Sequence, residues 1–217
     1  MIYCDGGSTY TKLLDHNGKI KIIATKELIK DRNRWFDIAT GHSMKNYCGT
    51  YVNELVALAH GSLALVPDNN FTVVDIGSRD TKYIIVKDRQ VSSLDWNTSC
   101  GGNLGFTLEL LGQFYHLSYD YLLPNQEKVP VACGLLGIEK IFDEINRGLT
   151  PEDGVAKFIH GMALNIYQFC QSPSTLYLSG GLAENKCFVK TLEKYCTINT
   201  LGRDVLLKGL VEIAKGT

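Results

Sequence analysis

The sequence lacks a long basic segment, a long apolar run and any pair of cysteines spaced as CxxC. Its formal net charge is −1 with 21% charged residues, which argues against a nucleic-acid surface and against an acidic tail. No stretch approaches the roughly 18 apolar residues that span a bilayer, and the first residues lack the pattern of a signal peptide. We therefore expect a cytoplasmic protein with no nucleic-acid partner and no membrane contact.

The chain has seven cysteines. In the cytoplasm these are expected to be free thiols, metal ligands or redox groups, because disulfide frameworks belong to oxidising compartments. Three of them lie among apolar neighbours and are expected to be small buried residues, namely Cys4, Cys170 and Cys196. Two others, Cys48 and Cys187, are expected in exposed loops.

The order of the predicted elements indicates an α/β chain of two lobes, which we place at residues 1–70 and 71–217. Each lobe opens with a β-hairpin whose first turn is rich in glycine. The pair Asn17 and Gly18 predicts a second hairpin turn in the first lobe. The order is not that of a Rossmann fold, in which a crossover helix would follow each strand.

Apolar residues at helical spacing predict six helices. The predicted helices cover residues 50–65, 103–116, 133–147, 151–171, 184–195 and 203–215. Thr150 and Pro151 are the expected N-cap and first residue of the fourth helix. A lone buried strand is expected over residues 175–181. For Glu54, on the first helix, we favour a position facing solvent over one that reaches a ligand cleft.

One eight-residue pattern occurs twice, as DGGSTYTK at residues 5–12 and as DIGSRDTK at residues 75–82. Each copy follows a short apolar run and precedes another, and five of the eight positions are identical. A single copy is typical of a tight hairpin turn, for which Asp, Gly and Ser are the usual residues. Two copies in matching contexts favour a duplicated ligand-binding turn.

The residue types in this pattern suit phosphate and magnesium. Glycine lets a backbone approach a ligand and its N–H groups can line an anion site, while a carboxylate suits Mg²⁺ or its waters. We assign a catalytic role, the orientation of Mg²⁺ and water, to Asp5 and Asp75. The expected phosphate-binding positions are Gly6, Gly7, Ser8, Thr9, Gly77 and Ser78. Lys12 and Lys82 receive no role, because either could point outward from its strand.

A third glycine-rich turn occurs in LYLSGGLAENK, where Gly180 and Gly181 separate a buried strand from a helix start. Glycines there let a flat ring lie against the backbone, and a helix N-terminus favours anions. Asn185 either caps that helix or contacts a nucleotide, and we favour the nucleotide contact.

Together the three turns resemble the two phosphate motifs and the adenosine motif of the actin, hexokinase and heat-shock-protein ATPase superfamily, whose lobes have a ribonuclease H-like fold. The internal repeat matches the duplicated origin of that fold. The resemblance implies that ATP or ADP binds between two actin-like lobes and that lobe closure is coupled to hydrolysis.

Two further cysteines each stand just before a predicted helix, Cys100 in WNTSCGGNLGF and Cys133 in VPVACGLLGIEK. The free N–H groups and positive potential of a helix N-terminus stabilise a thiolate and an anionic cluster. A [4Fe–4S] cluster usually takes four thiolates, so two positions in one chain predict a symmetric homodimer that shares the cluster. The alternative is two buried thiols.

These motifs, together with GLTPEDGVAKFIHGMA and ATGHSMKNYCGTYVNELVALAHGS, resemble the activator ATPases of 2-hydroxyacyl-CoA dehydratases and the related ATPase subunits of benzoyl-CoA reductases, over most of the chain. The resemblance implies a homodimeric ATPase with cluster ligands at Cys100 and Cys133. It also implies ferredoxin or flavodoxin as the electron donor. ATP would then drive delivery of a low-potential electron to a dehydratase or reductase.

The chain departs from that family at several positions. Ser78 and Arg79 stand where the second phosphate turn usually has Gly-Gln, and Ile138 and Lys140 occupy acidic positions that follow the second cluster ligand. Two alternatives therefore stay open. One is a small-molecule kinase on the same fold, similar to pantothenate kinases, with Asp80 as a base. The other is a nucleotide-sensing subunit that does not hydrolyse ATP.

Overall fold

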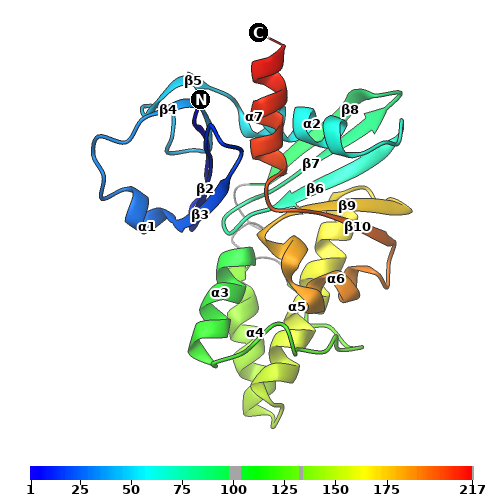
Figure 1. Ribbon diagram of the computed structural model, residues 1–217. Coiled ribbons are helices and arrows are strands. Elements are labelled where there is room, and N and C mark those ends of the chain that lie inside the picture. Colours follow the sequence, from blue (N-terminus) through cyan, green and yellow to red (C-terminus); the bar gives the residue numbers. More distant parts are fainter. Residues whose placement is uncertain (98–103, 132–133, 217) are drawn as a thin grey trace. The chain divides into compact units, whose positions relative to one another are not determined.

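The computed structural model describes residues 1–97, 104–131 and 134–216 (Figure 1). Strands form two five-stranded sheets and helices accompany both, which confirms the predicted α/β class. The strands are β1 (Tyr3–Gly6), β2 (Tyr10–Leu14), β3 (Ile20–Ala24), β4 (Phe36–Thr40), β5 (Cys48–Tyr51), β6 (Phe71–Ile76), β7 (Thr81–Lys87), β8 (Gln90–Asn97), β9 (Thr175–Gly180) and β10 (Thr197–Gly202). The helices are α1 (Thr25–Leu28), α2 (Glu54–Leu65), α3 (Leu104–Phe114), α4 (Gly134–Asn146), α5 (Pro151–Phe169), the 3₁₀ turn η1 (Gly181–Glu184), α6 (Lys186–Leu192) and α7 (Val205–Lys215).

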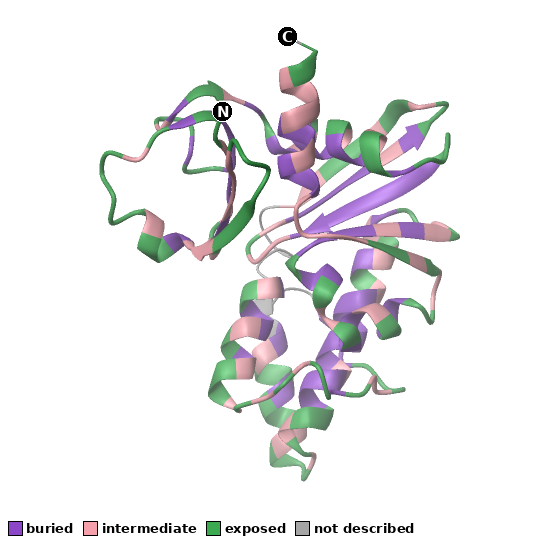
Figure 2. Cartoon of the chain, viewed as in Figure 1, coloured by how far each residue is buried: buried purple, intermediate pink, exposed green. Residues whose placement is uncertain are grey.

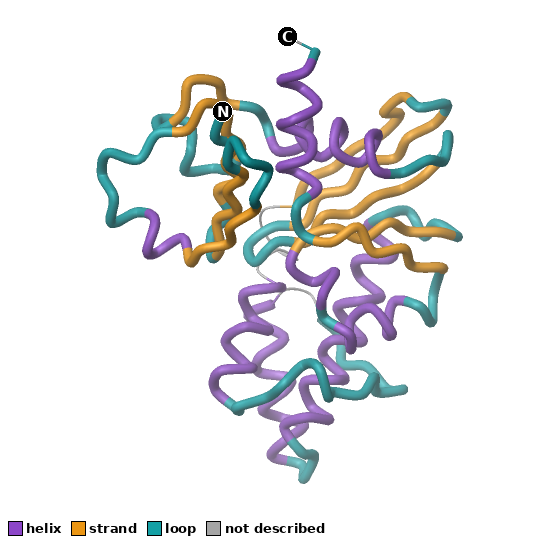
Figure 3. The backbone as a smooth tube through the Cα atoms, in the orientation of Figure 1, coloured by secondary structure: helices purple, strands orange, loops and turns teal. Residues whose placement is uncertain are grey.

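The chain divides into two compact units. The first comprises Met1–Phe71, Ile84–Leu94 and Arg203–Thr217, and the second comprises Thr72–Tyr83 and Asp95–Gly202. The sheet of the first unit has the strand order β3-β2-β1-β4-β5, and the other sheet has the order β10-β9-β6-β7-β8. Figure 3 shows helices α3, α4 and α5 lying together in the second unit.

The first sheet combines a hairpin with parallel strands. β1 pairs antiparallel with β2 and parallel with β4, and β4 pairs parallel with β5. Asn17 and Gly18 form the predicted turn between β2 and β3. Gly18 has a φ of +75°, and the Asp15 carboxylate accepts hydrogen bonds from the backbone N–H groups of Asn17 and Lys19. The carboxyl ends of β1 and β4 lie side by side, so the glycine-rich turn after β1 emerges at that edge.

Strand β5 precedes α2, so the predicted helix over 50–65 begins too early. The helix begins at Glu54, and the side chain of Asn53 caps it by accepting a hydrogen bond from the N–H group two residues later. Cys48 lies in β5 and is buried in one core cluster with Cys4, so its predicted place in an exposed loop is wrong. Glu54 is also buried, and the predicted position facing solvent is wrong as well.

Helices α2 and α7 pack directly against each other in the first unit, and glycine makes this contact possible. A Cβ atom on Gly209 would lie 1.8 Å from the carbonyl oxygen of Ala57. A Cβ atom on Gly61 would lie 2.0 Å from the carbonyl oxygen of Val205. Both distances are far below van der Waals contact, so each backbone touches the other where a larger residue does not fit.

In the second sheet, β9 lies between β6 and β10, and both pairings are parallel. The predicted strand over 175–181 is confirmed as β9, but it is not alone, because β10 follows and was not expected. Its sequence, TINTLG, is mostly exposed and offers no clear alternation of apolar and polar residues. The predicted helix over 184–195 is correspondingly shorter, since α6 ends at Leu192 and the chain turns into β10.

Helix α5 contributes much of the buried interior of the second unit (Figure 2). As predicted, Thr150 caps this helix and Pro151 is its first residue. The Thr150 hydroxyl accepts a hydrogen bond from the N–H group of Asp153 at 3.1 Å. Among the helices of the described residues, none combines the length and apolar character needed to cross a membrane.

The remaining described cysteines lie in the second unit. Cys170 is buried as predicted, and Cys196 is half-buried. Cys187 is fully buried in α6, so its predicted place in an exposed loop is wrong. Burial raises the pKa of the Cys187 thiol to about 11, which keeps it protonated and unreactive at neutral pH.

Replacing Gly209 by alanine tests the contact between α2 and α7. We expect Gly209→Ala to lower the free energy of unfolding by about 1–3 kcal/mol or more, because the added methyl group must displace the backbone of α2. Gly216→Ala is the matched control, since a Cβ atom there meets only ordinary contacts. Urea unfolding of both variants decides the point, and equal stability would contradict the close contact.

Candidate functional site

The first copy of the repeated pattern forms the turn between β1 and β2. The strand register places Asp5 directly opposite Lys12. Lys12 Nζ donates a hydrogen bond to Asp5 Oδ2 at 2.6 Å, and the Asp5 side chain is only 5% exposed. The pattern therefore builds a buried ion pair at the base of the turn.

Backbone contacts hold this first turn in shape. The Gly7 N–H group donates to the carbonyl oxygen of Asp5 at 3.2 Å, and the Thr25 hydroxyl donates to the carbonyl oxygen of Gly7 at 2.7 Å. A Cβ atom on Gly6 would lie 2.3 Å from the side chain of Met44. Glycine is thus required by close packing at this position.

The outer part of the first turn remains accessible. Ser8 is exposed and Thr9 is half-buried, so both hydroxyls can reach a ligand. A Cβ atom on Gly7 would lie 2.5 Å from the carbonyl oxygen of Tyr10, which leaves no room for a side chain on this part of the loop. The turn therefore presents backbone and hydroxyl groups above a buried carboxylate.

The second copy forms the turn between β6 and β7, where one lysine serves two carboxylates. Lys82 Nζ lies 3.5 Å from Asp75 Oδ2 and 3.1 Å from Asp80 Oδ1, and the Lys82 side chain is 3% exposed. The other carboxylate oxygen of Asp80 accepts a hydrogen bond from Trp96 Nε1 at 2.8 Å. Like Lys12, Lys82 points toward the aspartate of its own pattern.

The third turn is joined to the second one inside the second unit. Asp75 pairs in register with Ser179 across β6 and β9, and the Ser179 hydroxyl donates to Asp75 Oδ1 at 2.7 Å. Gly180 has a φ of +89°, and a Cβ atom on it would lie 2.4 Å from the carbonyl oxygen of Ile76. Gly181 follows and is exposed. The two turns therefore belong to one local site.

Asn185 has a structural role next to this site. Its Oδ1 accepts a hydrogen bond from the N–H group of Phe188 at 3.0 Å and so caps α6. Capping is the role that we did not favour from the sequence. A contact between Asn185 and a nucleotide stays a prediction.

The first turn of helix α3 packs on the turn between β6 and β7. The N–H group of Phe106 donates to the carbonyl oxygen of Ser78 at 2.9 Å. A Cβ atom on Gly105 would lie 2.5 Å from the carbonyl oxygen of Gly77. This contact could not be predicted from the sequence, because it joins residues that are far apart along the chain.

The structure gathers the predicted site residues into two groups, one in each unit. The first unit holds Asp5, Gly6, Gly7, Ser8 and Thr9, and the second holds Asp75, Gly77, Ser78, Gly180, Gly181 and Asn185. Cys100 and Cys133 lie outside the described residues. The polar residues that sequence reasoning missed are Lys12, Lys82 and Trp96. The signal that could have identified the two lysines is the spacing of seven residues between the aspartate and the lysine. This spacing places the two residues opposite each other when the turn of the hairpin lies midway between them.

The two ion pairs suit a phosphorylated ligand with Mg²⁺. Each pair supplies an ammonium group for phosphate oxygens and a carboxylate for Mg²⁺ or its waters, beside a turn with accessible backbone. Burial strengthens the attraction of these groups for a ligand that excludes water. The residues present therefore fit a magnesium nucleotide.

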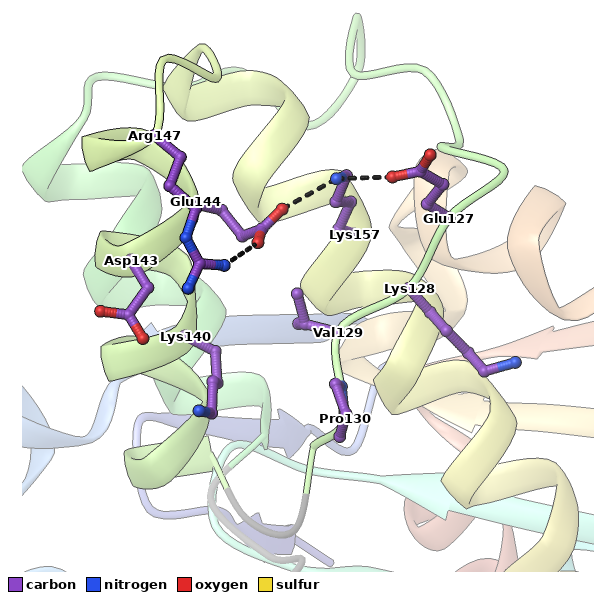
Figure 4. Close-up of a pocket in the computed structure, with 9 residues that line it drawn as sticks. All are labelled: Glu127, Lys128, Val129, Pro130, Lys140, Asp143, Glu144, Arg147 and Lys157. Atoms are coloured by element: carbon purple, nitrogen blue, oxygen red, sulfur yellow. Dashed lines mark hydrogen bonds and ion pairs between the residues drawn. The ribbon is translucent and has the colours of Figure 1, made fainter.

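A separate cavity of about 390 Å³ lies in the second unit (Figure 4). Lys157 Nζ lies between Glu127 Oε2, at 2.7 Å, and Glu144 Oε2, at 2.8 Å, and Arg147 pairs with Glu144 at 3.0 Å. The hydrogen bond from Lys157 lowers the pKa of the Glu144 carboxyl. These four charged side chains are therefore paired with one another, and the pair between Glu144 and Lys157 connects α4 to α5. Among the predicted site residues that the structure describes, none lines the cavity.

Comparison with known proteins gives one curated relative by sequence. The (R)-2-hydroxyglutaryl-CoA dehydratase activating ATPase of Acidaminococcus fermentans is 21% identical over 169 residues, which is 72% of this chain and 65% of that protein. The match thus spans less than two thirds of the relative's length. No family model matches the chain.

Two solved structures share the fold over nearly the whole chain. The activator of the 2-hydroxyisocaproyl-CoA dehydratase from Clostridium difficile, with bound ADPNP, has a TM-score of 0.78 at 19% identity and covers 99% of this chain and 93% of its own. Component A of the Acidaminococcus fermentans (R)-2-hydroxyglutaryl-CoA dehydratase has a TM-score of 0.74 at 20% identity, with coverages of 98% and 95%. The predicted actin-like ATPase fold is confirmed, and so is the resemblance to the activator ATPases.

A double-mutant cycle tests the ion pair of the first turn. We expect Lys12→Met to lower the free energy of unfolding by about 3 kcal/mol, because the Asp5 carboxylate then stays buried without its cation. Asp5→Asn in the same background should restore part of that loss. Lys21→Met, at an exposed position of β3, is the control and should change little. Additive effects in urea unfolding would show that the two groups are not coupled.

Proposed function

We propose that this chain, which resembles the activator ATPases of 2-hydroxyacyl-CoA dehydratases, binds and hydrolyses ATP as such an activator. The observation that carries the proposal is the repeated turn in which a buried aspartate is paired with a lysine beside accessible glycine and hydroxyl groups. The third turn adds a stretch of backbone without side chains at Gly180 and Gly181, and because Gly181 is exposed an adenine ring could lie against it. The resemblance in sequence and fold supports the same reading.

In this proposal the aspartates and lysines have complementary tasks. Asp5 and Asp75 orient the water shell of Mg²⁺ and the attacking water, and Mg²⁺ supplies charge that neutralises the phosphates. Lys12 and Lys82 turn from their aspartates toward phosphate oxygens when the nucleotide is bound. Backbone N–H groups and hydroxyls of both turns complete the phosphate contacts.

Replacing Asp75 tests the catalytic assignment. We expect Asp75→Asn to lower kcat for ATP hydrolysis by about 10²-fold or more, because water loses the carboxylate that orients it. Asp120→Asn, an exposed residue outside the three turns, should leave kcat unchanged. Phosphate formation measured after acid quenching under single-turnover conditions separates hydrolysis from product release. Full activity of Asp75→Asn would rule out this assignment.

The two alternative functions, a small-molecule kinase and a nucleotide-sensing subunit, require different properties of the second turn. A kinase with Asp80 as its base needs a free carboxylate oxygen, but Asp80 Oδ1 pairs with Lys82 and Oδ2 accepts from Trp96. Asp75, whose two oxygens are engaged by Ser179 and Lys82, would meet the same objection, so a screen for phosphate transfer to acceptor alcohols decides between the kinase and the activator. A nucleotide-sensing subunit without hydrolysis would bind ATP and leave it intact, which the kinetic measurement on the unmodified chain decides.

We further propose that Cys100 and Cys133 ligate one [4Fe–4S] cluster shared by two subunits. Helix α3 begins four residues after Cys100 and α4 begins directly after Cys133, as the sequence predicted. Neither helix has an acidic residue in its first turn, so the positive potential at both N-termini is available to an anionic cluster. The cluster would supply one-electron redox chemistry when bound.

An apolar stripe on α3 supports the proposed homodimer. Phe106, Leu110 and Phe114 follow one another at intervals of four residues, so they share a helix face, and all three are exposed. Phe142 on α4 extends the stripe, since its ring centroid lies 6.3 Å from that of Phe114. A second copy of the chain would cover this face.

The proposed partners follow from the resemblance. The electron donor is ferredoxin or flavodoxin, the acceptor is a dehydratase or reductase that acts on a CoA thioester, and the protein works in the cytoplasm. The names of the curated relative and of the solved structures support a dehydratase as the acceptor.

Iron analysis tests the cluster. Protein purified and reconstituted without oxygen should hold about four iron atoms and four sulfides per dimer. Cys100→Ser and Cys133→Ser should each lose most of the iron, whereas Cys196→Ser should retain it. Absence of iron from the unmodified chain would overturn the cluster while leaving the nucleotide site to stand.

A further inference from the structure

One chain of polar contacts runs through the second unit from the third turn to strand β8. The Ser179 hydroxyl donates to Asp75, Asp75 pairs with Lys82, Lys82 pairs with Asp80, and Asp80 accepts from Trp96. The Lys82 ammonium also lies 5.5 Å from the centroid of the Trp96 ring. Trp96, a residue of β8, is thus connected to the aspartate at the base of the second turn through two side chains.

Lys82 is the shared member of this chain. Its ammonium group is nearly as close to Asp75 Oδ2 as to Asp80 Oδ1, and its side chain has almost no access to water. A phosphate anion at the second turn adds a third acceptor for the same ammonium group. Binding of the phosphate must therefore weaken the ion pair between Lys82 and at least one of the two carboxylates. The hydrogen bond from Trp96 then contributes more to holding Asp80 in place.

Residues that precede and follow the segment 98–103 form hydrogen bonds with the turn between β6 and β7. On one side, Trp96 bonds Asp80 at 2.8 Å. On the other side, the N–H group of Phe106 donates to the carbonyl oxygen of Ser78 at 2.9 Å. Asp80 and Ser78 belong to the same turn, so a shift of that turn moves the end of β8 and the start of α3 together. Cys100 lies between these two anchors in the sequence.

We propose that Lys82, through its contact with the phosphate, and Trp96, as a positioning residue, hold Asp80 and transmit occupation of the second turn to β8. The inference rests on the proposed function in one respect, that a nucleotide phosphate binds this turn. Trp96 is the residue that responds to bound nucleotide, because its indole N–H is the last donor in the series of contacts from Ser179 to β8.

The indole N–H of Trp96 can be followed directly. The chain has two tryptophans, so ¹⁵N-tryptophan labelling gives two indole resonances, and Trp35→Phe identifies that of Trp96. We expect magnesium ADPNP to shift the Trp96 resonance in the unmodified protein. In Asp80→Asn, which keeps the shape but removes the charge that pairs with Lys82, nucleotide should still bind and the shift should be lost. Cooperative urea unfolding of that variant, together with its retained binding of ADPNP, shows that it is folded.

A kinetic measurement gives a second readout. Trp96→Phe keeps an aromatic side chain but replaces the indole by a smaller ring and removes the N–H donor. We expect it to lower kcat for ATP hydrolysis about tenfold, the effect of one hydrogen bond to a charged group, with less than a threefold change in the dissociation constant for ADPNP. Trp35→Phe, an exposed residue of the first unit, is the matched control and should leave both values unchanged.

The outcomes distinguish this inference from the proposed function. If ADPNP does not bind to the unmodified chain by calorimetry, the proposed function fails and the inference fails with it. If ADPNP binds but the Trp96 resonance does not move, only the inference is overturned. The same holds if the shift persists in full in Asp80→Asn, because Asp80 then transmits nothing.

Discussion

A buried carboxylate held against a lysine is the interaction on which both repeated turns depend. Asp5 and Asp75 end buried strands, where an unpaired charge is heavily penalised, and each is neutralised by a lysine of the following strand. In the first hairpin the register sets this spacing, because Asp5 stands directly opposite Lys12. The pair therefore fixes the register of the hairpin and the position of the glycine-rich turn above it.

The same ion pairs give the candidate site a defined resting state. Each carboxylate that we propose for the orientation of Mg²⁺ and water is satisfied without a ligand, and each lysine already stands beside the turn that would bind phosphate. In the second unit Lys82 is shared with Asp80, which connects the turn to β8 through Trp96. The carbonyl group of Ser78 connects it to α3. Hydrogen bonds thus connect the turn that we propose binds phosphate to the elements on both sides of Cys100 in the sequence.

Much of this arrangement could be predicted from local sequence. The duplicated turn, the hairpin at Gly18 and the cap at Thr150 follow from residue types with strong conformational preferences. Strand β10 could not, because it is an exposed edge strand without apolar alternation. The roles of Lys82 and Trp96 depend on which side of a strand faces a neighbour, and tertiary packing decides that. Cys48 and Cys187 look like loop residues by sequence, but packing buries them in elements whose bounds the sequence did not reveal.

We propose that the two lysines exchange an aspartate for a phosphate when the nucleotide binds. Crystal structures of the full chain with and without magnesium ADPNP test it most directly through the positions of Lys12 Nζ and Lys82 Nζ. Without nucleotide, we predict both ammonium groups at their aspartates, as found here. With nucleotide, both should lie within hydrogen-bond distance of phosphate oxygens. Lysines that stay on Asp5 and Asp75 while the phosphates contact other groups would contradict the account.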